Sequence, residues 1–186
     1  GTPAVKSVGK IQLTDADGPA SLNNNFTGVG SIGFPASTAF ACTWNRDLAK
    51  QFGEMIGDMA HDMHVAGWYA PAMNIHRSAF SGRTFEYFSE DPYLAGKMAA
   101  GYVRGIQSNG IAACPKHFAA NSQELRRMAS DSILDERTFR EIYLTGFEMV
   151  VKEAKPKTIM SAYNLINGTY ANENAHLLQE ILRKDW

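Results

Sequence analysis

The stretch "ACPKHFAAN" (residues 113–121) places two ionisable side chains, Lys116 and His117, inside a run that is otherwise largely apolar. The apolar residues before them, 110–115, predict a buried strand. Two adjacent potential cations are costly to bury without partners, so such a pair indicates a functional site. Side chains alternate across a strand, and both can face one side only where the strand ends or bulges, which Pro115 favours.

Strand-like and helical patterns alternate along the rest of the chain. Short apolar runs predict strands over 10–14, 67–75, 110–115 and 157–163. Apolar residues at three- and four-residue steps predict helices over 44–65, 92–109, 136–154 and 174–184. Pro92 and Asp135 suit the first turn and the N-cap of two of these helices. The alternation predicts βαβ units, and therefore an α/β fold with mainly parallel strands.

Such a sheet can be an open doubly wound sheet or a (β/α) barrel. No glycine-rich phosphate-binding loop follows any predicted strand, which favours the barrel. About four βα units are visible, whereas a full TIM-type barrel takes ~250 residues. The sequence therefore predicts a partial (β/α) barrel over residues 1–186, an incomplete domain whose remaining strands lie elsewhere.

Composition narrows the function classes. The 186 residues are 45% hydrophobic and 20% charged, with a net charge of −1, and they contain no clustered basic stripe. Nucleic acid and membrane are therefore not expected as partners. Cys42 and Cys114 lack nearby Cys or His partners at ligand spacing, so we expect free thiols and no metal or cofactor, although a disulfide stays open. The sequence indicates no cellular location.

Polar residues follow all four predicted strands. In parallel βα folds the working side chains stand at the carboxyl ends of strands. The residues at these positions are Asp15, Asp17, Asn74, His76, Lys116, His117, Met160, Tyr163 and Asn164. Asp17 also lies in a turn sequence, "DADGPA", that needs no function. The aromatic-rich segment "SGRTFEYFSEDPYL" (81–94) predicts a loop packed over the same site.

Six segments resemble, in order and spacing, the N-terminal barrel domain of glycoside hydrolase family three. They are "TDADGPA", "SGRTFEYFSEDPYLAG", "KHFAANSQELRR", "DERTFREIYL", "IMSAYNLINGTY" and "ENAHLLQEILRKDW". The resemblance implies a retaining, exo-acting β-glycosidase, a β-glucosidase that removes terminal β-D-glucosyl residues from oligosaccharides or glucosides. It implies no cofactor.

The resemblance also implies a pocket for one sugar ring. Asp17 would accept hydrogen bonds from two hydroxyls, and Arg83, Lys116 and His117 would surround the ring as donors. Arg127, oriented by Glu124, would form the wall, with Met160 and Tyr163 nearest the nucleophile. A buried polyol needs each hydroxyl matched, because an unmatched polar group costs roughly 1–3 kcal/mol.

Two positions depart from the family pattern. Asn23 stands where an arginine is common, which puts one sugar contact in doubt. The nucleophile is expected in a Ser-Asp-Trp segment beyond Trp186, about 5 Å from an acid/base carboxylate in another domain. Asp185-Trp186 imitates that motif but follows Lys184 at a helix end, so we expect Asp185 to be a surface residue. The catalytic carboxylates would then come from the remainder of the enzyme or from another chain.

Two other functions stay open. A lysine at the end of a barrel strand can form an imine, so Lys116 could serve a Schiff-base enzyme. Alternatively, the chain is a catalytically inactive sugar-binding fragment.

Overall fold

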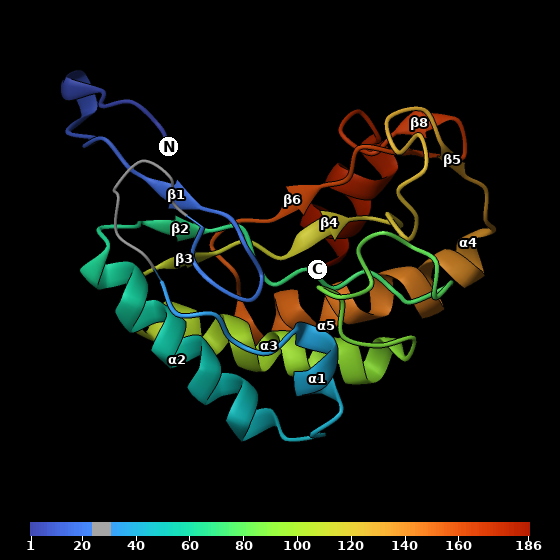
Figure 1. Ribbon diagram of the computed structural model, residues 1–186. Helices are drawn as coiled ribbons and strands as arrows, with labels where there is room; N and C mark the ends of the chain where they lie inside the picture. The colour runs from blue at the N-terminus through green and yellow to red at the C-terminus, as the bar shows by residue number, and fades with distance from the viewer. Residues whose placement is uncertain (24–30) are drawn as a thin grey trace.

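The computed structural model describes residues 1–23 and 31–186 (Figure 1). The helices are η1 (Lys6–Val8), α1 (Ser37–Ala41), α2 (Arg46–Asp62), α3 (Pro92–Ser108), α4 (Glu136–Thr138), η2 (Phe139–Leu144), α5 (Thr145–Ala154) and η3 (His176–Asp185). The strands are β1 (Asp15–Ala16), β2 (Gly67–Trp68), β3 (Ala112–Ala113), β4 (Lys116–Phe118), β5 (Asp131–Ser132), β6 (Met160–Ser161), β7 (Leu165–Ile166) and β8 (Thr169–Tyr170). No helix in these ranges is long and apolar enough to cross a membrane.

The principal strands run parallel in the order in which they occur along the chain. β1 pairs with β2, β2 with β3, and β4 with β6. A parallel bridge between Ala72 and Lys116 joins the chain after β2 to β4. Helices α1, α2, α3 and α5 lie on one side of these strands in Figure 1, and the described strands form an open arc without closing. This arrangement confirms the predicted α/β fold with mainly parallel strands as part of a barrel.

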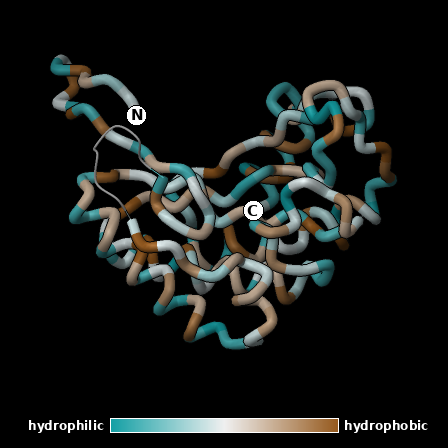
Figure 2. The backbone as a smooth tube through the Cα atoms, viewed as in Figure 1, coloured by the Kyte–Doolittle hydropathy of each residue, from teal (hydrophilic) through white to brown (hydrophobic). Residues whose placement is uncertain are grey.

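The two long helices form where the sequence predicts them, because their signals are local. The carboxylate of Asp91 accepts a hydrogen bond from the backbone N–H of Tyr93, and Pro92 opens α3. Helix α2 packs against α3 at glycines: a Cβ added to Gly105 would meet the carbonyl oxygen of Lys50 at 2.1 Å. Hydrophobic segments gather between helices and strands, whereas the ends of α2 are hydrophilic (Figure 2).

The predicted helix 136–154 forms as a continuous run of α4, η2 and α5, with a wider π-helical turn in its middle. Asp135 is its N-cap, as predicted, and accepts a hydrogen bond from the backbone N–H of Thr138 at 2.9 Å. The predicted helix 174–184 forms as η3, which buries Leu177 and Ile181.

A bulge occurs in β4, at the stretch with which the sequence analysis began. Lys116 pairs with Met160 and Phe118 pairs with Ser161, so two steps along β4 match one step along β6. His117 is the extra residue. A bulge re-aims side chains that would otherwise alternate. Of the two alternatives that the sequence left open, a strand end and a bulge, the structure has the bulge.

All four strand predictions were wrong in their bounds. Residues 10–14 do not join the sheet: Lys10 and Leu13 bridge back to Val5 and Thr2, and Ile11 is 71% exposed. The sheet strand begins at Asp15, because only there does the chain lie beside β2. The run 67–75 keeps strand pairing at its start, 110–115 narrows to β3 with β4 beginning directly after it, and 157–163 narrows to β6.

A second small sheet was not predicted. β7 pairs with β5 in parallel and with β8 antiparallel, above the far end of the principal strands in Figure 1. Its strands are two residues long, and β5 and β8 are partly or fully exposed, so they carry little of the apolar pattern by which strands are recognised.

Candidate active site at the strand ends

Asp17 and Lys116 meet across the sheet although 99 residues separate them along the chain. Asp17 follows β1 directly, and Lys116 begins β4. The Lys116 Nζ donates to Asp17 Oδ1 at 2.8 Å, and the lysine side chain is 2% exposed while that of Asp17 is 62% exposed. Burial alone would raise the pKa of Asp17, but the hydrogen bond and charge of Lys116 outweigh it and lower that pKa. The pair therefore presents an exposed, charged carboxylate that is hydrogen-bonded to a buried lysine.

Charged side chains of alternating sign form a second group, the arginine row, which consists of Glu86, Arg83, Glu124 and Arg127. The Arg83 guanidinium donates to the buried carboxylate of Glu86, and Arg83 Nη1 lies 3.8 Å from Glu124 Oε1. Glu124 in turn accepts from Arg127 Nη1 at 2.8 Å through its other oxygen. The Arg127 guanidinium stacks over the Tyr163 ring at 4.6 Å from the ring centre.

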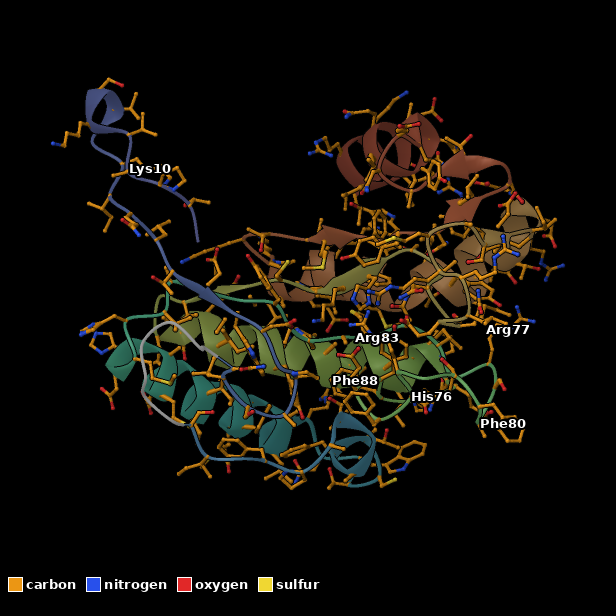
Figure 3. All side chains as sticks on the ribbon, turned by 45° about the horizontal axis from the view of Figure 1, so that its top comes forward. Lys10, His76, Arg77, Phe80, Arg83 and Phe88 are labelled. Atoms are coloured by element: carbon orange, nitrogen blue, oxygen red, sulfur yellow. The ribbon has the colours of Figure 1, made fainter. Side chains whose placement is uncertain are left out.

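This row has an electrostatic consequence for Arg83. Burial would lower the pKa of the Arg83 guanidinium, but the neighbouring charges, that of Glu86 first, raise it. Arg83 therefore stays positive. In Figure 3 Arg83 lies at the centre of the view, whereas the 98% exposed Phe80 projects at its edge.

His117 lies within range of both groups, since the charges of Arg83, Lys116 and Arg127 act on it. Its backbone N–H donates to Asn74 Oδ1 at 2.8 Å, and its carbonyl accepts from Asn74 Nδ2 at 2.8 Å. Burial, followed by the charges of Arg83 and Lys116, lowers the pKa of His117 from 6.5 to about 2. The imidazole is therefore neutral at pH 7.

The sequence predictions can now be compared with the structure. Six of the seven predicted site residues form two groups near the seventh, His117. One group is Asp17 and Lys116, with Met160 beside Lys116 in the strand register. The other is Arg83 and Arg127, joined through Glu124, with Tyr163 under the Arg127 guanidinium. Glu124 does contact Arg127, as predicted. Asp185 lies elsewhere: it is 43% exposed at the end of η3 and accepts from Arg140 at 3.2 Å.

Three strand-end residues have structural partners instead. Asp15 accepts from the Tyr69 hydroxyl at 3.2 Å, and His76 Nε2 lies 3.0 Å from the carbonyl oxygen of Thr84. Asn164 donates to the carbonyl oxygens of Ala119 and Leu165. These contacts hold loops together, because each partner is a neighbouring loop or strand.

Sequence reasoning missed three residues of the site's polar network. Glu86 is 2% exposed and holds Arg83, while Tyr87 and Asn121 connect His117 to Glu124. The aromatic context "FEYF" carried a signal for Glu86, since a carboxylate among buried aromatic residues needs a cationic partner. Asn121 carried none beyond its place after the Lys-His pair.

Parallel strands backed by helices, with charged groups gathered at the strand ends, define an α/β barrel-type domain. Residues 22–186 match the family described as glycosyl hydrolase family 3 N terminal domain. The chain belongs to this family.

Curated relatives and solved structures agree with this assignment. The chain is 44% identical to thermostable β-glucosidase B of Acetivibrio thermocellus over 100% of its own length and 26% of that protein. It is 49% identical to β-glucosidase A of Butyrivibrio fibrisolvens over 96% of its length and 22% of that protein. β-Glucosidase 3B from Thermotoga neapolitana, solved in complex with glucose, superposes with a TM-score of 0.94 at 46% identity, covering 100% of this chain and 27% of that one. The chain thus spans about a quarter of the length of these relatives.

Proposed function

We propose that residues 1–186 are the incomplete N-terminal (β/α)-barrel domain of a retaining, exo-acting β-glucosidase and that they bind the terminal β-D-glucosyl residue of a glucoside or oligosaccharide. The observation that carries the proposal is the Asp17–Lys116 pair, set at the strand ends opposite the arginine row. The relatives support glucose as the sugar, because they are named β-glucosidases and one was solved with glucose.

The site suits a sugar ring for a physical reason. A pyranose presents hydroxyls all around its edge, and each must be hydrogen-bonded when water is removed. Asp17 supplies an acceptor for two neighbouring hydroxyls, while Lys116, Arg83 and Arg127 supply fixed donors. Met160 and Tyr163 add an apolar edge that can face the C–H groups of the ring.

In the proposed reaction this domain positions the ring, and two carboxylates outside these 186 residues perform the displacement. One carboxylate attacks the anomeric carbon while the other protonates the leaving oxygen, and water then releases the glycosyl group with retention. Charges fixed around the ring hydroxyls lower the barrier where their contacts strengthen as positive charge develops on the ring.

The test uses the intact enzyme that contains this domain, with an aryl β-glucoside as substrate. Lys116→Ala removes a charged donor and should lower kcat/KM roughly 100-fold, because a hydrogen bond from a charged group contributes about 3 kcal/mol. The matched control is Lys97→Ala, since Lys97 is also paired with a carboxylate, Glu153, but joins helices α3 and α5. Proton NMR should show the β-anomer of glucose as the first product. Equal kcat/KM for Lys116→Ala and Lys97→Ala would overturn the assignment.

The Schiff-base alternative for Lys116 has weaker support. An imine needs an amine that is free to attack a carbonyl, whereas the Lys116 Nζ is 2.8 Å from Asp17 Oδ1 and its side chain is 2% exposed. Borohydride should therefore trap no carbonyl compound on Lys116.

A further inference from the structure

His117 has one ring nitrogen facing the protein and the other facing the proposed sugar site. Its Nδ1 lies 3.3 Å from Asn74 Oδ1 and 3.3 Å from the Tyr87 hydroxyl oxygen. Within residues 1–23 and 31–186, no protein atom is hydrogen-bonded to Nε2, and Nε2 is not among the buried side-chain atoms left without a partner. Nε2 is therefore the ring nitrogen that has no hydrogen-bond partner among the described residues.

The orientation of the Asn74 amide is fixed by a two-point contact. Its Oδ1 accepts the backbone N–H of His117, and its Nδ2 donates to the carbonyl of the same residue, both at 2.8 Å. Rotating the amide by 180° would set donor against donor and acceptor against acceptor. The atom that faces His117 Nδ1 is therefore an oxygen, which can only accept.

The Tyr87 hydroxyl leads to the same conclusion. It donates its proton to the carbonyl oxygen of Asn121 at 3.1 Å, so only its lone pairs remain for His117. Burial raises the pKa of Tyr87, which keeps that proton in place. Two acceptors thus face Nδ1, and both are satisfied only if Nδ1 carries the hydrogen.

We propose that Asn74 and Tyr87 are positioning residues that hold His117 in the tautomer protonated on Nδ1, so that Nε2 accepts a hydrogen bond from a hydroxyl of the bound sugar. This inference rests on the proposed function. It reverses the donor role that the family resemblance implies for His117. Lys116 and His117, adjacent in sequence, then do opposite work: the first donates to the sugar and the second accepts from it.

The surrounding charges are consistent with an acceptor at this place. Lys116, Arg83 and Arg127 are the cations that act on His117, while Glu86 and Glu124 are engaged by the two arginines. A neutral ring amid three cations avoids a fourth buried positive charge. The other side chains near His117 are mostly hydrogen-bond donors. A sugar hydroxyl that accepts from one of these cations still has its own proton to donate, and a neutral His117 can accept it.

Deoxy and deoxyfluoro glucosides, tested on the intact enzyme, can separate the two roles. Fluorine cannot donate a hydrogen bond, although it can accept one weakly. The quantity compared is the ratio of wild-type to His117→Leu kcat/KM for each substrate, in which the inductive effect of fluorine cancels. At the ring position that His117 contacts, this ratio should be tenfold or more for the glucoside and should fall toward one for both the deoxy and the fluoro analogue, because the donor to Nε2 is lost in both. If the fluoro analogue keeps the ratio while the deoxy analogue loses it, His117 is a donor and the inference is wrong.

The second arm changes the tautomer lock itself. Asn74→Asp places a carboxylate against Nδ1–H and raises the pKa of His117, so that Nε2 becomes a donor as the pH falls. The pH profile of kcat/KM should acquire an additional acidic limb with at least a tenfold decrease, and raising the pH should restore activity. Tyr87→Phe removes one acceptor and should weaken the discrimination at the His117 position without such a limb.

Asn167→Asp is the matched control for this arm. Asn167 makes the same two-point contact, accepting from the backbone N–H of Leu134 at 3.0 Å and donating to its carbonyl at 2.8 Å, but in the small sheet. It should leave the pH profile unchanged. A profile of Asn74→Asp with no added limb would overturn the positioning role. If instead Lys116→Ala also keeps full activity, the proposed function fails rather than the tautomer assignment.

Discussion

Two histidines in this chain are held by opposite physics. His117 is 2% exposed, bonded to neutral groups and surrounded by cations, and its pKa falls to about 2. His176 lies on η3 with its side chain 43% exposed, between Glu180 at 2.6 Å and Glu136 at 3.0 Å, and the Glu180 hydrogen bond first of all raises its pKa. The same side chain therefore stays neutral at the strand ends, whereas on η3 neighbouring carboxylates favour its cationic form.

The comparison shows that the low pKa of His117 comes first of all from burial and not merely from charged neighbours, whereas the hydrogen bond to Glu180 is the largest influence on His176. The cluster of Glu136, Arg140, His176, Glu180 and Asp185 contains four ion pairs, as many as the surroundings of His117, yet all its members are substantially exposed. Exposed pairs contribute at most ~1 kcal/mol each because water screens them. His117 at the strand ends is buried, so its protonation state is set strongly.

The largest expected effect is an acid dependence of stability caused by His117. Its folded pKa lies below the unfolded value of 6.5, so the unfolded chain binds the extra proton and stability falls as the pH drops below 6.5. From pH 6.5 to pH 4 this group should cost about 3 kcal/mol, since each pH unit is worth 1.36 kcal/mol. Urea denaturation of wild type and His117→Asn at both pH values measures it. A parallel loss in both proteins would show that His117 is not the source.

A smaller effect is expected from Asp17→Asn. It leaves the Lys116 cation buried beside a neutral amide, and losing a charged hydrogen bond should lower the free energy of unfolding by about 2 kcal/mol. Asp185→Asn removes the exposed partner of Arg140 and should change it by less than ~1 kcal/mol. Both are measured by urea denaturation at pH 7. Equal losses would contradict the contrast between the two regions.

The smallest effect is expected from His176→Gln. The folded pKa of His176 is raised, so its contribution is present below the unfolded pKa of 6.5 and is lost as the pH rises through the folded value. The substitution should lower the free energy of unfolding by at most ~1 kcal/mol at pH 5.5 and leave it unchanged at pH 9. The effect is small because the His176 side chain is exposed and water screens its ion pairs. Thermal unfolding at the two pH values, repeated in 0.5 M salt, tests it. A cost that persists at pH 9 would mean that packing of η3, not charge, holds His176.

Local patterns explain why much of the fold was predictable. The bounds of α2 and α3 follow from apolar periodicity and from Asp91 and Pro92, which act within one helical turn. Strand bounds were less predictable, because a strand exists only where a neighbour lies beside it. The apolar run 10–14 therefore stayed outside the sheet, while the polar Asp15 entered it beside Gly67.

By itself, the sequence determined the α/β class and the family, because these depend on residue types at fixed spacing. Its set of site residues stays a prediction. Tertiary structure alone decided which groups meet and in what state. It brought Asp17 to Lys116 and placed Asn74 and Tyr87 against His117 Nδ1. Whether a histidine donates or accepts depends on distances and desolvation across strands far apart in the chain, and no local pattern records those.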